Sequence, residues 1–139
     1  MRFSVLVALA VILPLAARGA DTKATPMTPA PIVFFDLAGP DMDKQRAFYA
    51  GAFGWSIDPS GAIKGAGLDG TLRKDPTDKI FYLGVPDVTA ALNDVVAQGG
   101  TVIMPRFEVK GVVVIGLFKD PAGNSMGLVE MKDGKPVVP

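Results

Sequence analysis

The fold is decided by residues 34–42, FFDLAGPDM, because this stretch recurs as residues 80–88, IFYLGVPDV, at a constant offset of 46 positions. Asp41 of the first copy aligns with Asp87 of the second. In both copies an apolar strand runs into a Pro-Asp turn, then a segment of helical length, then a glycine. Such internal repetition predicts two equivalent modules within one domain.

Each repeated aspartate predicts a helix N-cap, because its carboxylate can accept hydrogen bonds from the first free backbone amides. We therefore expect helices over residues 42–53 and 88–98. The second segment has the i, i+3, i+4, i+7, i+8 spacing of a buried helical stripe. The apolar residues expected to be buried are Ala47, Phe48, Ala52 and Phe53 in the first helix and Val88, Ala91, Leu92, Val95 and Val96 in the second.

Short strands are expected after each helix, separated by turn residues such as the sequence DPAGN at 120–124. The repeat unit is therefore βαβββ, used twice, and the fold class is α+β. The expected strands after the helices are residues 55–58, 62–64 and 67–73 in the first module and residues 101–104, 112–118 and 125–131 in the second.

The two ends of the chain differ from the repeated part. Residues 1–20 predict a signal peptide, since Arg2 precedes an apolar run and small residues follow it, with cleavage after Gly19 or Ala20. A retained membrane anchor is the alternative, although a spanning helix needs about 20 apolar residues and Pro14 interrupts this run. Residues 21–31 predict a Pro/Thr-rich linker, 32–131 the folded domain and 132–139 a loose C-terminal tail. Export predicts a periplasmic or secreted protein that does not stay in the membrane after cleavage.

The composition excludes several kinds of site. The 139 residues include no cysteine and no histidine, so thiolate ligands, imidazole ligands and both residue types as catalytic groups are absent from the sequence. The 14 basic residues balance the 14 acidic ones and form no cluster, which indicates no nucleic-acid partner.

Three segments together resemble the vicinal oxygen chelate superfamily, which includes glyoxalase I, bleomycin-resistance proteins and extradiol dioxygenases. They are PDMDKQRAFYAGAFGW at 40–55, PDVTAALNDVVAQGGTVI at 86–103 and LFKDPAGNSMGLVE at 117–130. The resemblance covers residues 32–131 and implies a glyoxalase-like fold, in which the two modules form a half-open, barrel-like sheet around a cavity. In the metalloenzymes of the superfamily that cavity holds a divalent metal ion.

The metal ligands of the family do not carry over onto this sequence. The resemblance places the two histidine positions on Phe34 and Ile80, and the glutamate position of the last strand on Gly127. The fourth ligand falls within residues 65–73, where Asp69 is the only carboxylate. Because a phenyl ring, an alkyl chain and a glycine offer no donor atom, we expect no metal and no other cofactor.

Alternation along strands places Phe34 with Asp36 on one sheet face, and Ile80 with Tyr82 on one face. With Gly127 on the last strand, these five residues are the predicted ligand-binding residues. Asp36 is the one carboxylate among them. It is expected either to accept hydrogen bonds from the backbone or from Tyr82, or to act as a base with a pKa raised by burial.

The sequence therefore predicts a metal-free binding protein for a small, partly apolar molecule, with no assigned catalytic residue. The alternative is an enzyme of the lyase, isomerase or dioxygenase type with a rearranged carboxylate site built from Asp36, Asp69 or Glu130. A third alternative is an interaction module, and a homodimer is expected because a sheet of this size has edges to cover. Trp55 is expected in the core, and Glu130 is expected in a contact on the opposite face from Gly127.

Overall fold

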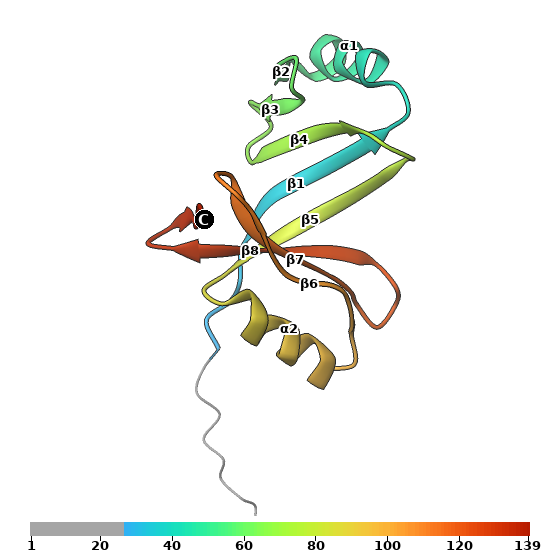
Figure 1. The fold of residues 1–139 in the computed structure, drawn as a ribbon. Helices are drawn as coiled ribbons and strands as arrows, with labels where there is room; N and C mark the ends of the chain where they lie inside the picture. The colour runs from blue at the N-terminus through green and yellow to red at the C-terminus, as the bar shows by residue number, and fades with distance from the viewer. Residues whose placement is uncertain (1–26) are drawn as a thin grey trace, which may run out of the picture.

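The computed structural model describes residues 27–139, which form one mixed sheet with two helices (Figure 1). The predicted signal peptide, residues 1–20, and most of the predicted linker lie outside the described residues. In the described part no helix is long and apolar enough to cross a membrane.

The two βαβββ modules follow one another along the chain. The first contains β1 (Ile32–Gly39), α1 (Met42–Phe53), β2 (Ser56–Ile57), β3 (Ala62–Lys64) and β4 (Asp69–Lys74). The second contains β5 (Asp78–Val85), α2 (Val88–Ala97), β6 (Thr101–Val109), β7 (Val113–Lys119) and β8 (Ser125–Lys132), and a short β9 (Lys135–Pro136) follows it.

The modules join edge to edge in the order β2-β3-β4-β1-β5-β8-β7-β6. The two first strands, β1 and β5, run antiparallel at the centre, and each pairs in parallel with the last strand of its own module. In Figure 1 the helices lie near opposite ends of this open sheet. The prediction of an α+β fold with two βαβββ modules is confirmed.

Both helices begin at the predicted aspartates. Asp41 Oδ1 accepts a hydrogen bond from Lys44 N at 3.0 Å, and Asp87 Oδ1 accepts one from Ala90 N at 2.9 Å. Gly54 ends α1 with φ of 70°, a left-handed conformation that favours glycine. The repeated Pro-Asp motif therefore sets the start of each helix, as the sequence predicted.

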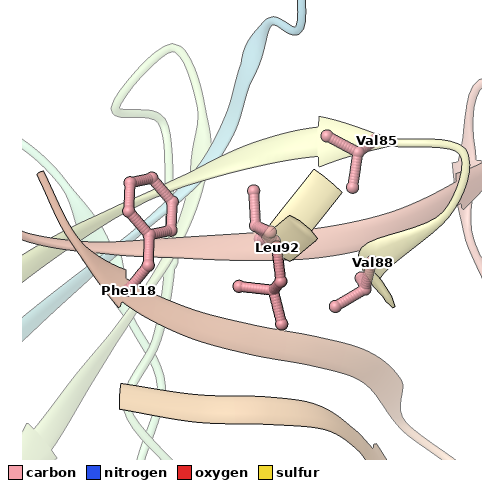
Figure 2. Packing of buried hydrophobic residues seen from close by; sticks show 5 residues of the cluster. Val85, Val88, Leu92 and Phe118 are labelled. Atoms are coloured by element: carbon pink, nitrogen blue, oxygen red, sulfur yellow. The ribbon is translucent and has the colours of Figure 1, made fainter. Parts of the chain in front are cut away.

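Helix α2 buries residues against its sheet, whereas α1 contacts the sheet only through half-buried residues such as Met42, which packs against the Phe35, Ile63 and Leu72 cluster. Val88 and Leu92 are buried in a cluster with Val85, Phe118 and Leu128. Figure 2 shows this cluster and labels all of its residues except Leu128. The predicted burial of α1 is wrong, because none of its residues is buried. Its four expected core residues, Ala47, Phe48, Ala52 and Phe53, are exposed. In α2 the expected Val96 is exposed as well.

The C-terminal segment is a hairpin rather than the predicted loose tail. Strand β9 pairs with Met131 and Lys132 of β8, and Pro139 O accepts a hydrogen bond from Gly111 N at 3.0 Å. The turn between β8 and β9 is Asp133-Gly134, and both residues have positive φ, at 51° and 74°. Asp-Gly is a strong signal for a two-residue hairpin turn. Residues 132–139 are therefore ordered by a turn whose signal is present in the sequence.

Candidate functional site

The five predicted site residues come together on one face of the sheet, which we call the inner face because it points away from the helices. Phe34 pairs with Tyr82 across β1 and β5, and Asp36 pairs with Ile80. Tyr82 pairs in turn with Gly127 across β5 and β8. Residues directly opposite one another in a ladder share a face, so strand alternation and register together bring the five residues into one patch.

The ring of Tyr82 lies over Gly127. A Cβ atom at Gly127 would lie 2.8 Å from Tyr82 Cγ and closer still to Cδ1, which is inside the normal contact distance. Phe34 meets the same tyrosine edge to face, with ring centroids 5.8 Å apart and planes at 72°. Residue 127, where the resemblance places the family's acidic ligand, thus has no room for a longer side chain while Tyr82 keeps this position.

The inner face is well packed around these rings. Asp36, Ile80 and Tyr82 are 6%, 7% and 8% exposed. Phe34 is half-buried. Apolar residues of β1, β7 and β8 cover the cluster: Val33, Val113, Ile115, Leu117, Val129 and Met131. The patch is therefore largely apolar, with Asp36 as its buried charge.

Asp36 is held by Arg73, which was not among the partners expected from the sequence. Arg73 Nε donates to both carboxylate oxygens, at 2.8 and 3.0 Å, and the same guanidinium also pairs with Asp75. The expected partners were the backbone and Tyr82. The only sequence feature that pointed to this pair was the alternation of side chains along β4, which puts Arg73 on the same face as Thr71. Thr71 lies opposite Asp36 in the parallel β1–β4 ladder.

Burial raises the pKa of two side chains on the inner face, Asp36 and Tyr82. It raises the pKa of Asp36 above its ordinary 3.8, and the nearby Arg73 guanidinium opposes that shift. Burial also raises the pKa of Tyr82, and the negative charge of Asp36 adds to the effect. The pKa of Asp36 is thus raised, as the base alternative expected, but hydrogen bonds from Arg73 occupy its carboxylate.

The three carboxylates of the alternative enzyme do not converge. Asp36 binds Arg73, Asp69 pairs with Lys64 at 2.8 Å, and Glu130 pairs with Arg106 at 2.9 Å. Among residues 27–139, no group of three or more acidic, histidine or cysteine residues is placed to hold a metal ion. A family-type divalent ion therefore does not fit the side chains present on this face.

Glu130 makes the expected contact on the opposite face from Gly127. Its carboxylate accepts from Arg106 Nε and from one terminal guanidinium nitrogen of Arg106, both at 2.9 Å, and from Val88 N at 3.2 Å. Hydrogen bonds from Arg106, followed by the backbone bond from Val88, lower the pKa of Glu130. Glu130 thus links β6 and β8 to the first turn of α2.

Trp55 lies on the helix side of the sheet and is half-buried rather than fully inside the core. Its ring stacks on Tyr49 of α1, with centroids 4.8 Å apart and planes only 8° from parallel. Both rings line a cavity of about 300 Å³ between α1 and the sheet. No pattern in the sequence predicted this cavity.

Comparison with known proteins finds no matching family model. Among sequence relatives, CFP32 from Mycobacterium bovis, named as a candidate glyoxylase, is 29% identical over 111 residues that cover 67% of this chain. The anthracycline biosynthesis protein DnrV from Streptomyces peucetius is 29% identical over 130 residues that cover 73% of it. The chain spans 42% and 46% of the lengths of these two curated relatives, which is less than half.

Solved structures share the fold. A glyoxalase/bleomycin resistance/dioxygenase superfamily member from Vibrio splendidus matches with a TM-score of 0.53 and 14% identity, over 73% of this chain and 97% of its own. Methylmalonyl-CoA epimerase from Streptomyces coelicolor matches with a TM-score of 0.52 and 18% identity, over the same shares of the two chains. These relatives and neighbours confirm the resemblance to the vicinal oxygen chelate superfamily, and the chain has its glyoxalase-like fold.

Proposed function

We propose that this domain binds a small, partly apolar molecule at the inner face, without a metal ion and without catalysing a reaction. The observation that carries the proposal is the Tyr82 ring over Gly127. An acidic metal ligand at residue 127 would need the volume that this ring fills. Aromatic carbon thus takes the place of an oxygen donor. Phe34 and Ile80, at the two positions where the resemblance places histidine ligands, supply no donor atom either.

The inner face offers two kinds of contact to such a molecule. The half-buried Phe34 provides apolar surface, and the buried Tyr82 and Ile80 lie beside it in the same patch. Arg73 provides the polar contact, because its side chain is 33% exposed while it holds Asp36. A mostly apolar site with a few placed polar groups is the usual form of a small-molecule site. The names of the two sequence relatives also refer to chemistry on small molecules.

The carboxylate enzyme that the sequence left open gains no support from the geometry. Its three candidate acids lie in three separate ion pairs, and each would have to lose its cation before it could join a shared metal site. Metal-independent binding needs no such rearrangement.

The first experiment is elemental analysis of the purified chain after incubation with Mn²⁺, Ni²⁺, Zn²⁺ and Mg²⁺ and desalting. We expect no retained metal. Near-stoichiometric retention of any of the four ions would overturn the proposal and lead to a search for a carboxylate site and a lyase assay.

The second experiment is a thermal-shift screen of small, partly apolar compounds against the unaltered chain and Phe34→Ala. Compounds that bind the inner face should raise the melting temperature of the unaltered chain, and their shift should change in Phe34→Ala. Phe53→Ala is the matched control, since Phe53 is 63% exposed on α1. Shifts that respond to Phe53→Ala and not to Phe34→Ala would contradict binding at the inner face.

We also propose that the protein is exported and that it forms a homodimer, and each of these two predictions has its own test. N-terminal sequencing of the protein recovered from the periplasm or medium tests cleavage after Gly19 or Ala20. Light scattering of the purified chain tests the homodimer, for which the outer strands β2 and β6 are the available edges of the sheet. A monomer mass across the concentration range would contradict the dimer.

A further inference from the structure

We propose that the helix side of the sheet carries a second binding site, for a planar aromatic molecule with a carboxylate group. The site is the cavity of about 300 Å³ that Tyr49 and Trp55 line together with Phe35, Leu68, Lys79 and Phe81. Phe35 and Phe81 alternate with the inner-face residues along β1 and β5, so this cavity lies on the other side of the sheet from Tyr82, and Asp36 is the one inner-face residue that borders it. The proposal does not depend on the function proposed for the inner face.

Aromatic rings line the wall of the cavity. Tyr49 and Trp55 are stacked almost parallel, and the Phe35 ring lies 5.7 Å from Trp55 at a tilt of 58°. Gly70 allows Phe35 to lie there, because a Cβ atom at Gly70 would be 2.6 Å from Phe35 Cε1. Offset stacking and edge contacts with such a wall favour a planar ring over a bulky aliphatic group.

The apolar surface of this cavity is not covered by α1. Leu68 and Phe81 are 38% and 43% exposed at its rim, although both are large apolar residues. Exposed apolar surface of this kind, gathered around a cavity of about 300 Å³, is what a small-molecule site needs in order to gain free energy on binding. A single aromatic ring system is of suitable size.

Lys79 supplies the charge at the edge of the cavity. Among residues 27–139, no carboxylate lies within ion-pair distance of its ammonium group. Asp36 also borders the cavity, but its carboxylate is hydrogen-bonded to Arg73. The ammonium group is therefore the charge available to a ligand, and it selects an anion.

A neighbouring cavity of about 470 Å³ shares Lys79 and Phe81 with the first one. Its two acids are already engaged. Asp120 accepts hydrogen bonds from Asn124 and Ala122 within its turn, and Asp78 accepts from Lys79 N. A carboxylate on the ligand would thus meet Lys79 between the two cavities without displacing an existing ion pair.

The test uses Trp55 as a reporter, because the chain contains a single tryptophan and that residue lines the site. The full chain is titrated with 4-nitrobenzoate, a planar aromatic carboxylate whose nitro group quenches tryptophan fluorescence, and with the neutral 4-nitrobenzamide. We expect saturable quenching by the carboxylate, with an apparent Kd about threefold lower than that of the amide, as suits one exposed ion pair. N-acetyltryptophanamide gives the linear response of unbound tryptophan.

Variants assign the contacts. Lys79→Gln should bring the Kd of the carboxylate to that of the amide, and Tyr49→Ala should weaken both probes because the stacked wall is lost. Lys132→Gln, an exposed lysine that does not line either cavity, is the matched control and should bind like the unaltered chain. Circular dichroism confirms that each variant is folded.

Three results would overturn the proposal. Quenching that stays linear, as for free tryptophan, would show that no site is present. Equal affinity for the two probes, with no effect of Lys79→Gln, would remove the carboxylate from the proposed ligand. Quenching that is lost in Phe34→Ala but kept in Lys79→Gln would place the probe on the inner face instead.

Discussion

The aromatic ring of Tyr82 rests on the backbone of Gly127 in the next strand of the sheet. The two residues lie directly opposite each other in the parallel β5–β8 ladder, so the absent side chain of one makes room for the ring of the other. Phe35 and Gly70 repeat the arrangement in the β1–β4 ladder on the other face. An aromatic ring over glycine is therefore used twice, once in each parallel pair of strands.

Substitution of Gly127 by alanine should destabilise the fold, because the new Cβ atom would overlap the Tyr82 ring. We expect Gly127→Ala to lower the free energy of unfolding by about 1–3 kcal/mol, the usual cost of overpacking. Urea denaturation measures the change. Gly51→Ala is the matched control. Apart from the adjoining backbone of α1, no atom lies within 4 Å of a Cβ atom at Gly51, so alanine there should instead stabilise the chain by about 0.5–1 kcal/mol. Equal unfolding midpoints for Gly127→Ala and the unaltered chain would show that the Tyr82 ring moves freely.

The two helices should respond differently to truncation of their apolar residues. Leu92 of α2 is 5% exposed in the cluster of Figure 2, so Leu92→Ala should cost about 2–5 kcal/mol. Phe53 of α1 is exposed, and Phe53→Ala should change the free energy of unfolding by less than about 0.5 kcal/mol. Thermal and urea unfolding measure both. A large loss in Phe53→Ala would mean that α1 packs against a surface that the monomer does not show.

Removal of Arg73 should make the free energy of unfolding depend more strongly on pH. In Arg73→Met the cation that opposes the effect of burial is lost, so the pKa of Asp36 should rise further above 3.8. A carboxyl group whose pKa is higher in the folded state binds more protons there, so its unfavourable contribution shrinks as the pH falls through the folded pKa. We expect the deficit of Arg73→Met against the unaltered chain to be largest near neutral pH and smaller near about pH 4. Urea midpoints across this range measure it, and a deficit independent of pH would contradict a charged Asp36.

Glu130 should show the opposite pH dependence. Its pKa is lowered in the folded state, so its stabilising contribution is present above the ordinary value of 4.5 and is lost as the pH falls through the lowered folded pKa. Glu130→Gln should therefore be less stable than the unaltered chain at neutral pH, and the difference should vanish in acid. Asp43→Asn is a suitable control, because Asp43 is highly exposed and, among residues 27–139, its one ion pair is with Arg46 in the same helix. A difference that persists below the folded pKa would indicate that packing, not charge, links β8 to α2.

Local features of the sequence were enough to predict the elements of the fold. The Pro-Asp repeat predicted where each helix begins, since an N-cap acts over only three residues. The two-residue period of strands predicted that Phe34 and Asp36 share a face, as do Ile80 and Tyr82. The Asp133-Gly134 turn could also have been found this way, because its signal lies in two adjacent residues.

Contacts between distant strands could not be predicted in the same way. The pairing of Asp36 with Arg73 depends on the register of the parallel β1–β4 ladder, and the position of Tyr82 over Gly127 depends on the β5–β8 ladder. The exposure of Phe48 and Phe53 depends on which side of α1 meets the sheet, where Met42 and Tyr49 make the contacts instead. None of these quantities is a property of a short stretch of chain.

The sequence by itself therefore determined the two βαβββ modules, the helix starts and the residues that share the inner face. The tertiary structure alone decided that this face is filled by aromatic rings, that its buried acid is held by Arg73, and that a cavity lies beside Trp55 on the other side. The physical reason is that capping and strand alternation act within a few residues, whereas ring packing and buried ion pairs form only when strands far apart in the chain adopt one register.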